Sequence, residues 1–196
     1  MTKFANNRSA LRRLPLSLGV VVLSLFAVSV KSQNAAAPPP ELTALLDRVA
    51  IEDLLVDYYA QIGTDNHDFS KYFTTDGTLE VNGLIANGKA EITGLYDRAG
   101  GGIEETTSSS DDKVPPGKFN MVMSNLKVAV HGDTSVANML WYSIVSPTLI
   151  APPSVTEHGH DRTELVRQGG RWLISKRVVT SDGGMPEGLL DSYLGR

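Results

Sequence analysis

Residues 163–177, TELVRQGGRWLISKR, form two alternating apolar and polar segments that meet at Gly169-Gly170. Alternation with a period of two is typical of strands that bury one face. A Gly-Gly pair readily adopts the positive φ angles that a tight hairpin turn requires. We therefore predict strands over 155–168 and 171–180, joined as an antiparallel hairpin.

The same period of two extends upstream of this hairpin. It predicts two further strands, over 118–130 and 134–150. His131-Gly132-Asp133 lies between these strands, and Ala151-Pro152-Pro153 separates the second of them from the hairpin. Gly, Asp and Pro are the residues that turns favour. The second half of the chain thus predicts an antiparallel meander.

The first half carries helical signals. Apolar side chains recur at three- and four-residue steps over 41–62, which predicts an amphipathic helix that ends at Gly63. A helical turn over 68–73, a short strand over 78–81 and a second helix over 89–98 are expected next. Helices followed by a run of strands are typical of the α+β class.

Residues 99–117 break this pattern. The segment AGGGIEETTSSSDDKVPPG is rich in Gly, Ser, Thr, Asp and Pro and has few apolar residues. We therefore expect a long mobile loop, either disordered or acting as a lid over a site.

The amino terminus has the layout of an export signal. Residues 1–13 are polar and basic, and 14–30 form an apolar run that is short for a membrane-spanning helix. We expect a signal peptide over 1–34, with an uncleaved anchor as the alternative, and a periplasmic or secreted location. An Ala/Pro linker over 35–40, a domain over 41–182 and a tail over 183–196 complete the organisation.

Composition narrows the chemistry. The chain of 196 residues has no cysteine, which excludes disulfides, thiolate nucleophiles and Cys-type metal sites. Residues 1–33 hold five basic and no acidic side chains, so 13 basic and 22 acidic side chains remain, a net charge of −9. This charge argues against a nucleic-acid partner and against stable association with an anionic membrane once the signal is removed.

Several motifs follow one another in a recognisable order. They are Ala50-Ile51-Glu52-Asp53-Leu54-Leu55 and Tyr58-Tyr59 on the first helix, Asp65-x-x-Asp68, Val130-x-Gly132-Asp133 before a strand, and the hairpin 163–177. In order and spacing, residues 41–182 resemble the SnoaL-like branch of the NTF2-like superfamily. The resemblance implies a curved antiparallel sheet, wrapped into a cone by N-terminal helices, with an apolar internal pocket. Its enzymes, which include polyketide cyclases, scytalone dehydratase and ketosteroid isomerase, transfer protons without a cofactor.

The resemblance suggests three catalytic candidates. It places a carboxylate just past the first helix, where Asp65 or Asp68 would act as a base, and a polar pocket residue at Asp161. Strand alternation puts His160 and Asp161 on opposite faces. We expect His158 or His160 to reach the pocket mouth as an acid, or both to lie on the surface. His158-x-His160 lacks further ligands at suitable spacing, so we predict neither a metal nor a cofactor.

Tyr58, Asn120 and Trp141 are the candidates for substrate binding. Tyr58 and Tyr59 are adjacent, so we expect only one to face the sheet. Asn120 stands where the dehydratases carry an imidazole, which argues against a copy of their mechanism, although an amide could still polarise an oxygen or be a strand-end residue. Trp141 would stack a planar ligand or fill the core. Charged strand residues are expected in exposed cross-strand pairs: Arg162, Glu164, Arg167 and Arg177.

The sequence therefore predicts an exported, cofactor-independent lyase or isomerase. It would act by acid–base catalysis on a hydroxylated aromatic or cyclic small molecule, through dehydration, retro-aldol cleavage or a double-bond shift. The alternative is a non-catalytic periplasmic binding or accessory protein with the same fold. We expect a homodimer in either case.

Overall fold

The computed structural model describes residues 38–64, 68–107 and 113–183. Helix α1 (Pro40–Gln61) and the 3₁₀ helix η1 (Phe69–Tyr72) come first, as expected. The other elements are β1 (Phe73–Val81), β2 (Leu84–Asn87), α2 (Gly88–Thr107), β3 (Pro116–His131), β4 (Thr134–Thr148), β5 (Ser154–Gln168) and β6 (Arg171–Ser181). The predicted signal peptide, Asp65 and nearly all of the predicted C-terminal tail lie outside the described residues.

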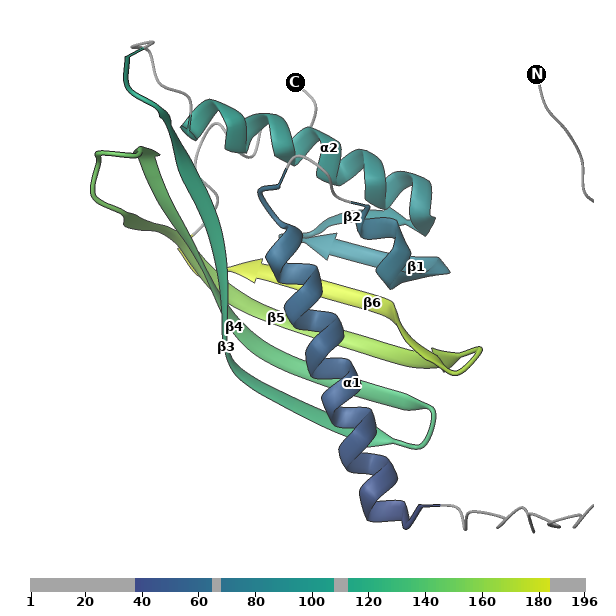
Figure 1. The fold of residues 1–196 in the computed structure, drawn as a ribbon. Coiled ribbons are helices and arrows are strands. Elements are labelled where there is room, and N and C mark those ends of the chain that lie inside the picture. The colour runs from purple at the N-terminus through teal and green to yellow at the C-terminus, as the bar shows by residue number, and fades with distance from the viewer. Residues whose placement is uncertain (1–37, 65–67, 108–112, 184–196) are drawn as a thin grey trace, which may run out of the picture. The chain divides into compact units, whose positions relative to one another are not determined.

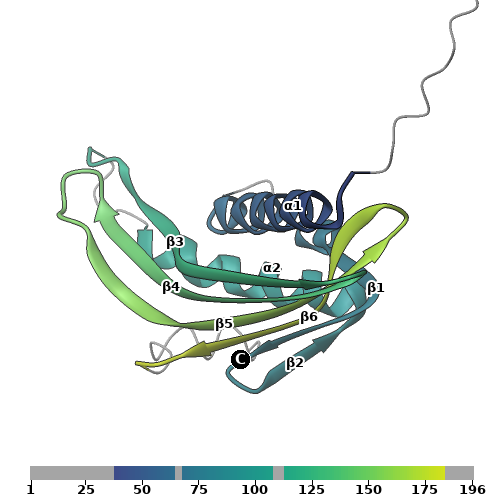
Figure 2. The ribbon, with the colours of Figure 1, turned by 90° about the horizontal axis from the view of Figure 1, so that it is seen from below.

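The described strands form one curved sheet. Its strand order is β2-β1-β6-β5-β4-β3, and both helices lie on its concave side (Figures 1 and 2). This confirms the predicted α+β cone. Two details differ from the prediction. Strand β2 was not expected, and β1 pairs with β6 in parallel although all other pairs are antiparallel.

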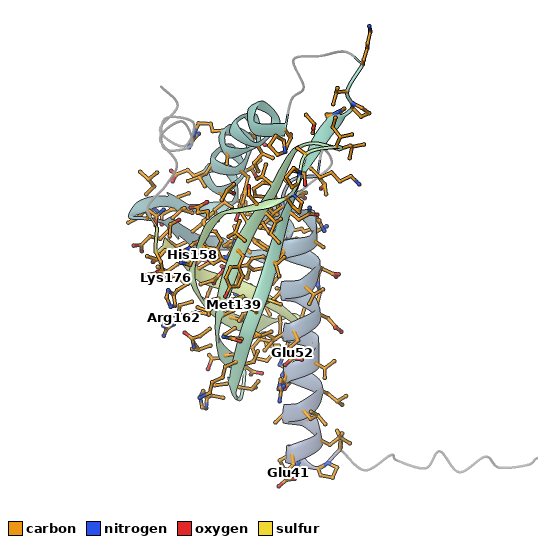
Figure 3. All side chains as sticks on the ribbon, turned by 90° about the vertical axis from the view of Figure 1, so that its left-hand side faces the viewer. Glu41, Glu52, Met139, His158, Arg162 and Lys176 are labelled. Atoms are coloured by element: carbon orange, nitrogen blue, oxygen red, sulfur yellow. The ribbon has the colours of Figure 1, made fainter. Side chains whose placement is uncertain are left out.

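The β5–β6 hairpin forms as predicted. Strand β5 pairs with β6 from Gly159↔Ser181 to Gln168↔Arg171, and Gly169 and Gly170 have φ angles of 57° and 77°. These angles lie in the left-handed region that glycine adopts without strain. Figure 3 shows the resulting division of side chains, with Met139 facing the helices and Arg162 pointing away from them.

The predicted loop over 99–117 is largely wrong. Helix α2 continues to Thr107, and β3 begins at Pro116. The helical spacing of Ile92 and Leu95 continues through Ala99, which is 5% exposed, and Ile103, which is half-buried. Packing along this face outweighs the cost of glycine in a helix, which is about 1 kcal/mol per residue.

Helix α1 is apolar on two faces. Ile51, Leu55 and Tyr58 are fully buried against the sheet. The opposite face exposes Leu45 and Val56, each by 53%. Within the described residues, no helix is long and apolar enough to cross a membrane.

Candidate functional site

An ion pair lies at the centre of the concave face. The Arg177 Nε atom of β6 is 2.6 Å from Oδ2 of Asp161 on β5, and the two side chains are 3% and 0% exposed. Thr163 Oγ1 donates a hydrogen bond of 2.7 Å to the other Asp161 oxygen. Burying two charges is costly unless they are paired and hydrogen-bonded, and this pair meets both conditions.

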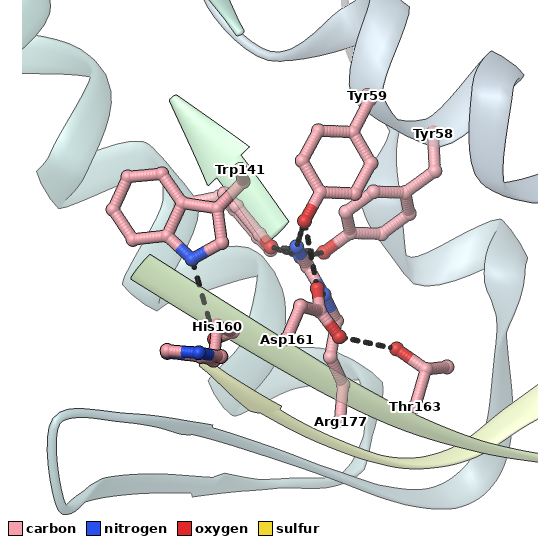
Figure 4. Close-up of polar contacts among 8 residues, drawn as sticks. Tyr58, Tyr59, Trp141, His160, Asp161, Thr163 and Arg177 are labelled. Atoms are coloured by element: carbon pink, nitrogen blue, oxygen red, sulfur yellow. Dashed lines mark hydrogen bonds and ion pairs between the residues drawn. The ribbon is translucent and has the colours of Figure 1, made fainter. Parts of the chain in front are cut away.

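Two tyrosines of α1 complete the surroundings of this pair (Figure 4). The Arg177 guanidinium lies 4.3 Å from the ring centre of Tyr58 and 5.1 Å from that of Tyr59. Tyr59 accepts a hydrogen bond of 3.0 Å from Arg177 Nη2 and donates one of 2.8 Å to Asp161. Both tyrosines are therefore buried, so the expectation that only one would face the sheet is wrong.

A pair of phenols extends the cluster towards α2. Arg177 Nη1 donates to the Tyr58 hydroxyl and, over 2.9 Å, to the Tyr96 hydroxyl, and the two hydroxyls are hydrogen-bonded to each other. Burial raises the pKa of Tyr58 well above its usual value, against the lowering effect of the Arg177 charge. Burial likewise raises the pKa of Tyr96. Both phenols therefore keep their protons at neutral pH.

The hydroxyl protons of Tyr58 and Tyr96 are not both used within the cluster. Arg177 donates to both hydroxyl oxygens, and one phenol proton is used in the bond between them. The second phenol proton has no acceptor in the part of the chain that the structure describes. Buried donors normally have acceptors, so the arrangement is suited to a ligand oxygen.

The structure brings together three of the predicted site residues. Tyr58 and Asp161 share the Arg177 cluster, and Trp141, which is 3% exposed, lies on the same sheet face. The Trp141 indole donates a hydrogen bond of 3.3 Å to the His160 carbonyl oxygen, across β5 (Figure 4). Asp65 lies outside the described residues.

His160 and Asn120 do not join this cluster. The His160 side chain is 63% exposed on the outer face, where its Nδ1 lies 2.9 Å from Asp182. Asn120 is exposed and pairs with Ile144, in register with the outer-face pair Val122↔Tyr142. Strand alternation turns both side chains away from the helices. His160 therefore lies on the surface, the alternative to the pocket mouth, and Asn120 does not face a ligand on the concave side.

Arg177 and Tyr96 were missed as candidates. Arg177 was expected in an exposed pair, because strict alternation from the buried Trp172 would place it on the outer face. Glu164 of β5 pairs with Lys176 and Leu165 pairs with Ile174, so Ser175 is an extra residue in β6. The alternation of buried and exposed side chains along β6 reverses at this point. A bulge of this kind turns subsequent side chains to the other face.

Arg167 is likewise not in a simple exposed pair. Its Nη2 is 2.5 Å from Asp47 on α1, its Nε is 3.0 Å from Asp133, and its guanidinium stacks over Trp172 at 4.5 Å. The hydrogen bond from Arg167 lowers the pKa of Asp47. Asp47, Arg167 and Trp172 line one end of a groove of about 720 Å³ between α1 and the β5–β6 turn. Arg167 is paired with Asp47 and Asp133 and stacks on Trp172, which indicates a structural clamp.

Comparison with known proteins now identifies the family. Residues 43–178 match the SnoaL-like domain, so the chain belongs to this family of NTF2-like proteins. No curated protein matches the sequence significantly.

Solved structures share the fold at low sequence identity. Rv3472 of Mycobacterium tuberculosis, a protein of unknown function, is 18% identical with a TM-score of 0.62, over 80% of this chain and 92% of that one. An NTF2-like protein of Novosphingobium aromaticivorans is 23% identical with a TM-score of 0.59, over 76% and 92%. A provisionally named scytalone dehydratase from the same organism is 19% identical with a TM-score of 0.55, over 72% and 87%.

Proposed function

We propose that this protein is a cofactor-independent lyase or isomerase that moves protons on an oxygenated cyclic or aromatic small molecule. The family includes cyclases, dehydratases and isomerases, which supports this reaction class. The observation that carries the proposal is the Tyr58–Tyr96 hydroxyl pair, polarised by the buried Arg177, with a phenol proton left to donate.

The proposed chemistry begins at a substrate oxygen. A carbonyl oxygen would accept the spare phenol proton in a hydrogen bond while a base removes a proton from the adjacent carbon. The electron pair of the broken C–H bond moves into the carbonyl, and negative charge develops on the oxygen. Donors already aligned in a dehydrated site stabilise such charge strongly, and the loss of one donor typically costs about 10²–10³-fold in rate.

The other candidates have distinct proposed roles. Asp161 accepts hydrogen bonds from Arg177, Tyr59 and Thr163, so it is a positioning residue that fixes the guanidinium. Trp141 would form an aromatic wall beside the substrate. Asp65 remains a proposed base. We also propose export through residues 1–34 and assembly as a homodimer.

Deuterium exchange into a simple ketone tests this proposal. The purified protein is incubated in D₂O with 2-tetralone, whose α-protons exchange only through an enol or enolate, and loss of the α-proton signals is followed by NMR. Wild-type protein should exceed the buffer rate, and Tyr96→Phe should lose about 10²-fold because a donor is removed. Tyr142→Phe, on the outer face, is the matched control. Exchange no faster than buffer for wild type, or equal rates for wild type and Tyr96→Phe, would overturn the proposal.

One observation favours a second candidate, a binding protein without chemistry. The Asp161 carboxylate is fully engaged by its neighbours, so the Arg177 cluster itself contains no free base. In that case 2-naphthol would bind, as followed by the fluorescence of Trp141 in a Trp172→Phe background, and 2-tetralone would not exchange.

A further inference from the structure

Glu157 lies on the same face of the sheet as the Arg177 cluster, and no motif of the sequence pointed to it. It pairs with Ser143, which is 1% exposed, while the neighbouring pair Tyr142↔His158 stacks on the outer face. Glu157 therefore faces the concave side. It precedes Asp161 by four residues on β5, a separation of about 13 Å along an extended strand.

The surface between Glu157 and Asp161 is formed by an aromatic ring. Gly159 is the intervening residue on this face, and a Cβ atom there would lie 1.9 Å from the Thr180 carbonyl oxygen, so no other residue fits. Trp141 pairs with Gly159, and its indole reaches across β5 to the His160 carbonyl. The ring thus lies between the carboxyl group and the phenol cluster.

The Glu157 carboxyl group is held in place at one oxygen. Ser181 donates a hydrogen bond to Oε1, and Asn82 of the β1–β2 turn donates to the Ser181 hydroxyl over 3.2 Å. Asn82 also accepts a bond of 2.8 Å from the Ser181 amide. Glu157 Oε2 receives no hydrogen bond from the described residues. A carboxylate oriented by one neighbour and free at its second oxygen is the arrangement that a general base needs.

Burial and access at Glu157 also suit proton transfer. Burial raises the pKa of Glu157 above its usual value, opposed by the Ser181 hydrogen bond and by the charge of His158. Glu157, Met121 and Met123 face the concave side and are only partly buried, and Tyr96, whose hydroxyl joins the Arg177 cluster, is also only partly buried. Side chains of the described residues therefore leave the concave face around Glu157 partly accessible to solvent.

We propose that Glu157 is a catalytic carboxylate of this site and that Trp141 stacks a flat aromatic ketone whose carbonyl oxygen reaches the Tyr58–Tyr96 pair. This inference rests on the proposed function. Glu157 takes a proton from a carbon beside the substrate carbonyl, so the C–H bond breaks and an O–H bond forms on the carboxyl group. The electron pair passes to the carbonyl oxygen, held by the phenols. Return of the proton to the same carbon completes the exchange, and in a substrate with a C=C bond β,γ to the carbonyl its return to the γ-carbon completes a double-bond shift.

Matched carboxyl variants test this assignment in the 2-tetralone exchange assay. Glu157→Gln should lower the exchange rate by about 10²-fold or more, the usual contribution of a general base. Glu164→Gln, an exposed outer-face change on the same strand, should leave the rate unchanged. Cyclohexanone, which has no aromatic ring to stack on Trp141, should exchange far more slowly than 2-tetralone. Far-ultraviolet circular dichroism and thermal melting verify that each variant is folded.

The pH profile adds a readout that a purely structural role would not change. Exchange should rise with pH as Glu157 loses its proton, with a midpoint above that of an ordinary Glu, about 4.3. Ser181→Ala should move this midpoint to higher pH, because the lost hydrogen bond favours the charged carboxylate. Glu157→Gln should abolish the inflection.

The outcomes separate the two proposals. If wild type and Glu157→Gln exchange 2-tetralone equally fast, the role of Glu157 is overturned while the proposed function stands. A loss confined to Asp65→Asn would then assign the base to Asp65. If the wild-type protein binds 2-naphthol without exchanging 2-tetralone, both the proposed function and the role of Glu157 are overturned.

Discussion

The two arginines of the β5–β6 hairpin region make the same kinds of contact in different surroundings. Arg177 pairs with Asp161 and stacks on Tyr58, and Arg167 pairs with Asp47 and stacks on Trp172. The Arg177 side chain is 3% exposed, whereas that of Arg167 is 26% exposed. The dehydrated pair can polarise a ligand oxygen, because water does not weaken its field. The solvated pair mainly joins α1 to the turns beside it.

The largest expected effect follows from removing the buried cation. Arg177→Met leaves Asp161 as a buried charge without its partner, which should lower the free energy of unfolding by about 3–5 kcal/mol. Urea denaturation measures the loss. A change below about 1 kcal/mol would show that water reaches Asp161 and that the two ion pairs are energetically alike.

The next effect is a loss of stability at alkaline pH. Burial raises the pKa values of Tyr58, Tyr59 and Tyr96 in the folded protein. The neutral phenols therefore contribute stability below the unfolded value, about 10, and this contribution is lost as the pH rises beyond it. Absorbance at the tyrosinate band should show these phenols ionising only as the protein unfolds. Their free titration in the folded protein would contradict a dehydrated cluster.

A smaller effect is expected from Arg167, the more exposed of the two arginines. Arg167→Met should cost about 1–2 kcal/mol at neutral pH, since it removes charge-assisted hydrogen bonds and a cation–π contact. The pKa of Asp47 is lowered in the folded state, so its contribution is present above the unfolded value and is lost as the pH falls below about 4. The difference between wild type and variant should shrink over this range. A difference independent of pH would exclude the ion pair as its source.

The smallest effect belongs to Arg162 and Glu164, whose side chains are 50% and 45% exposed. Glu164→Gln should change the free energy of unfolding by less than about 0.5 kcal/mol, because exposed ion pairs contribute little. Thermal or urea unfolding checks this value. A larger loss would mean that the outer face is covered in solution.

The regular parts of the fold were predictable from local pattern. Helix α1 and the β5–β6 hairpin follow from apolar spacing and from Gly169-Gly170, which are short-range signals. The glycines at 100–102 suggested a loop, yet Ala99 and Ile103 continue the buried spacing of α2. Tertiary packing, which local composition does not report, decided that segment.

The candidate site was predictable only in part. Tyr58, Asp161 and Trp141 were placed correctly on the concave side, because helix and strand periods fix their faces. Arg177 was missed because the bulge in β6 reverses its face, and alternation alone cannot locate a bulge. Tyr96 contacts Tyr58, which is 38 residues away in sequence, and local pattern does not predict a contact over this separation.

The parallel pairing of β1 with β6 has a consequence for how the protein folds. Tyr58 and Arg177, which share a hydrogen bond, are 119 residues apart in sequence. Non-local contacts of this kind slow folding, because the intervening chain must be ordered before they form. The polar cluster therefore assembles only after the last strand has been synthesised and docked. Truncation before β6 would leave the tyrosines and Asp161 without the cation that organises them.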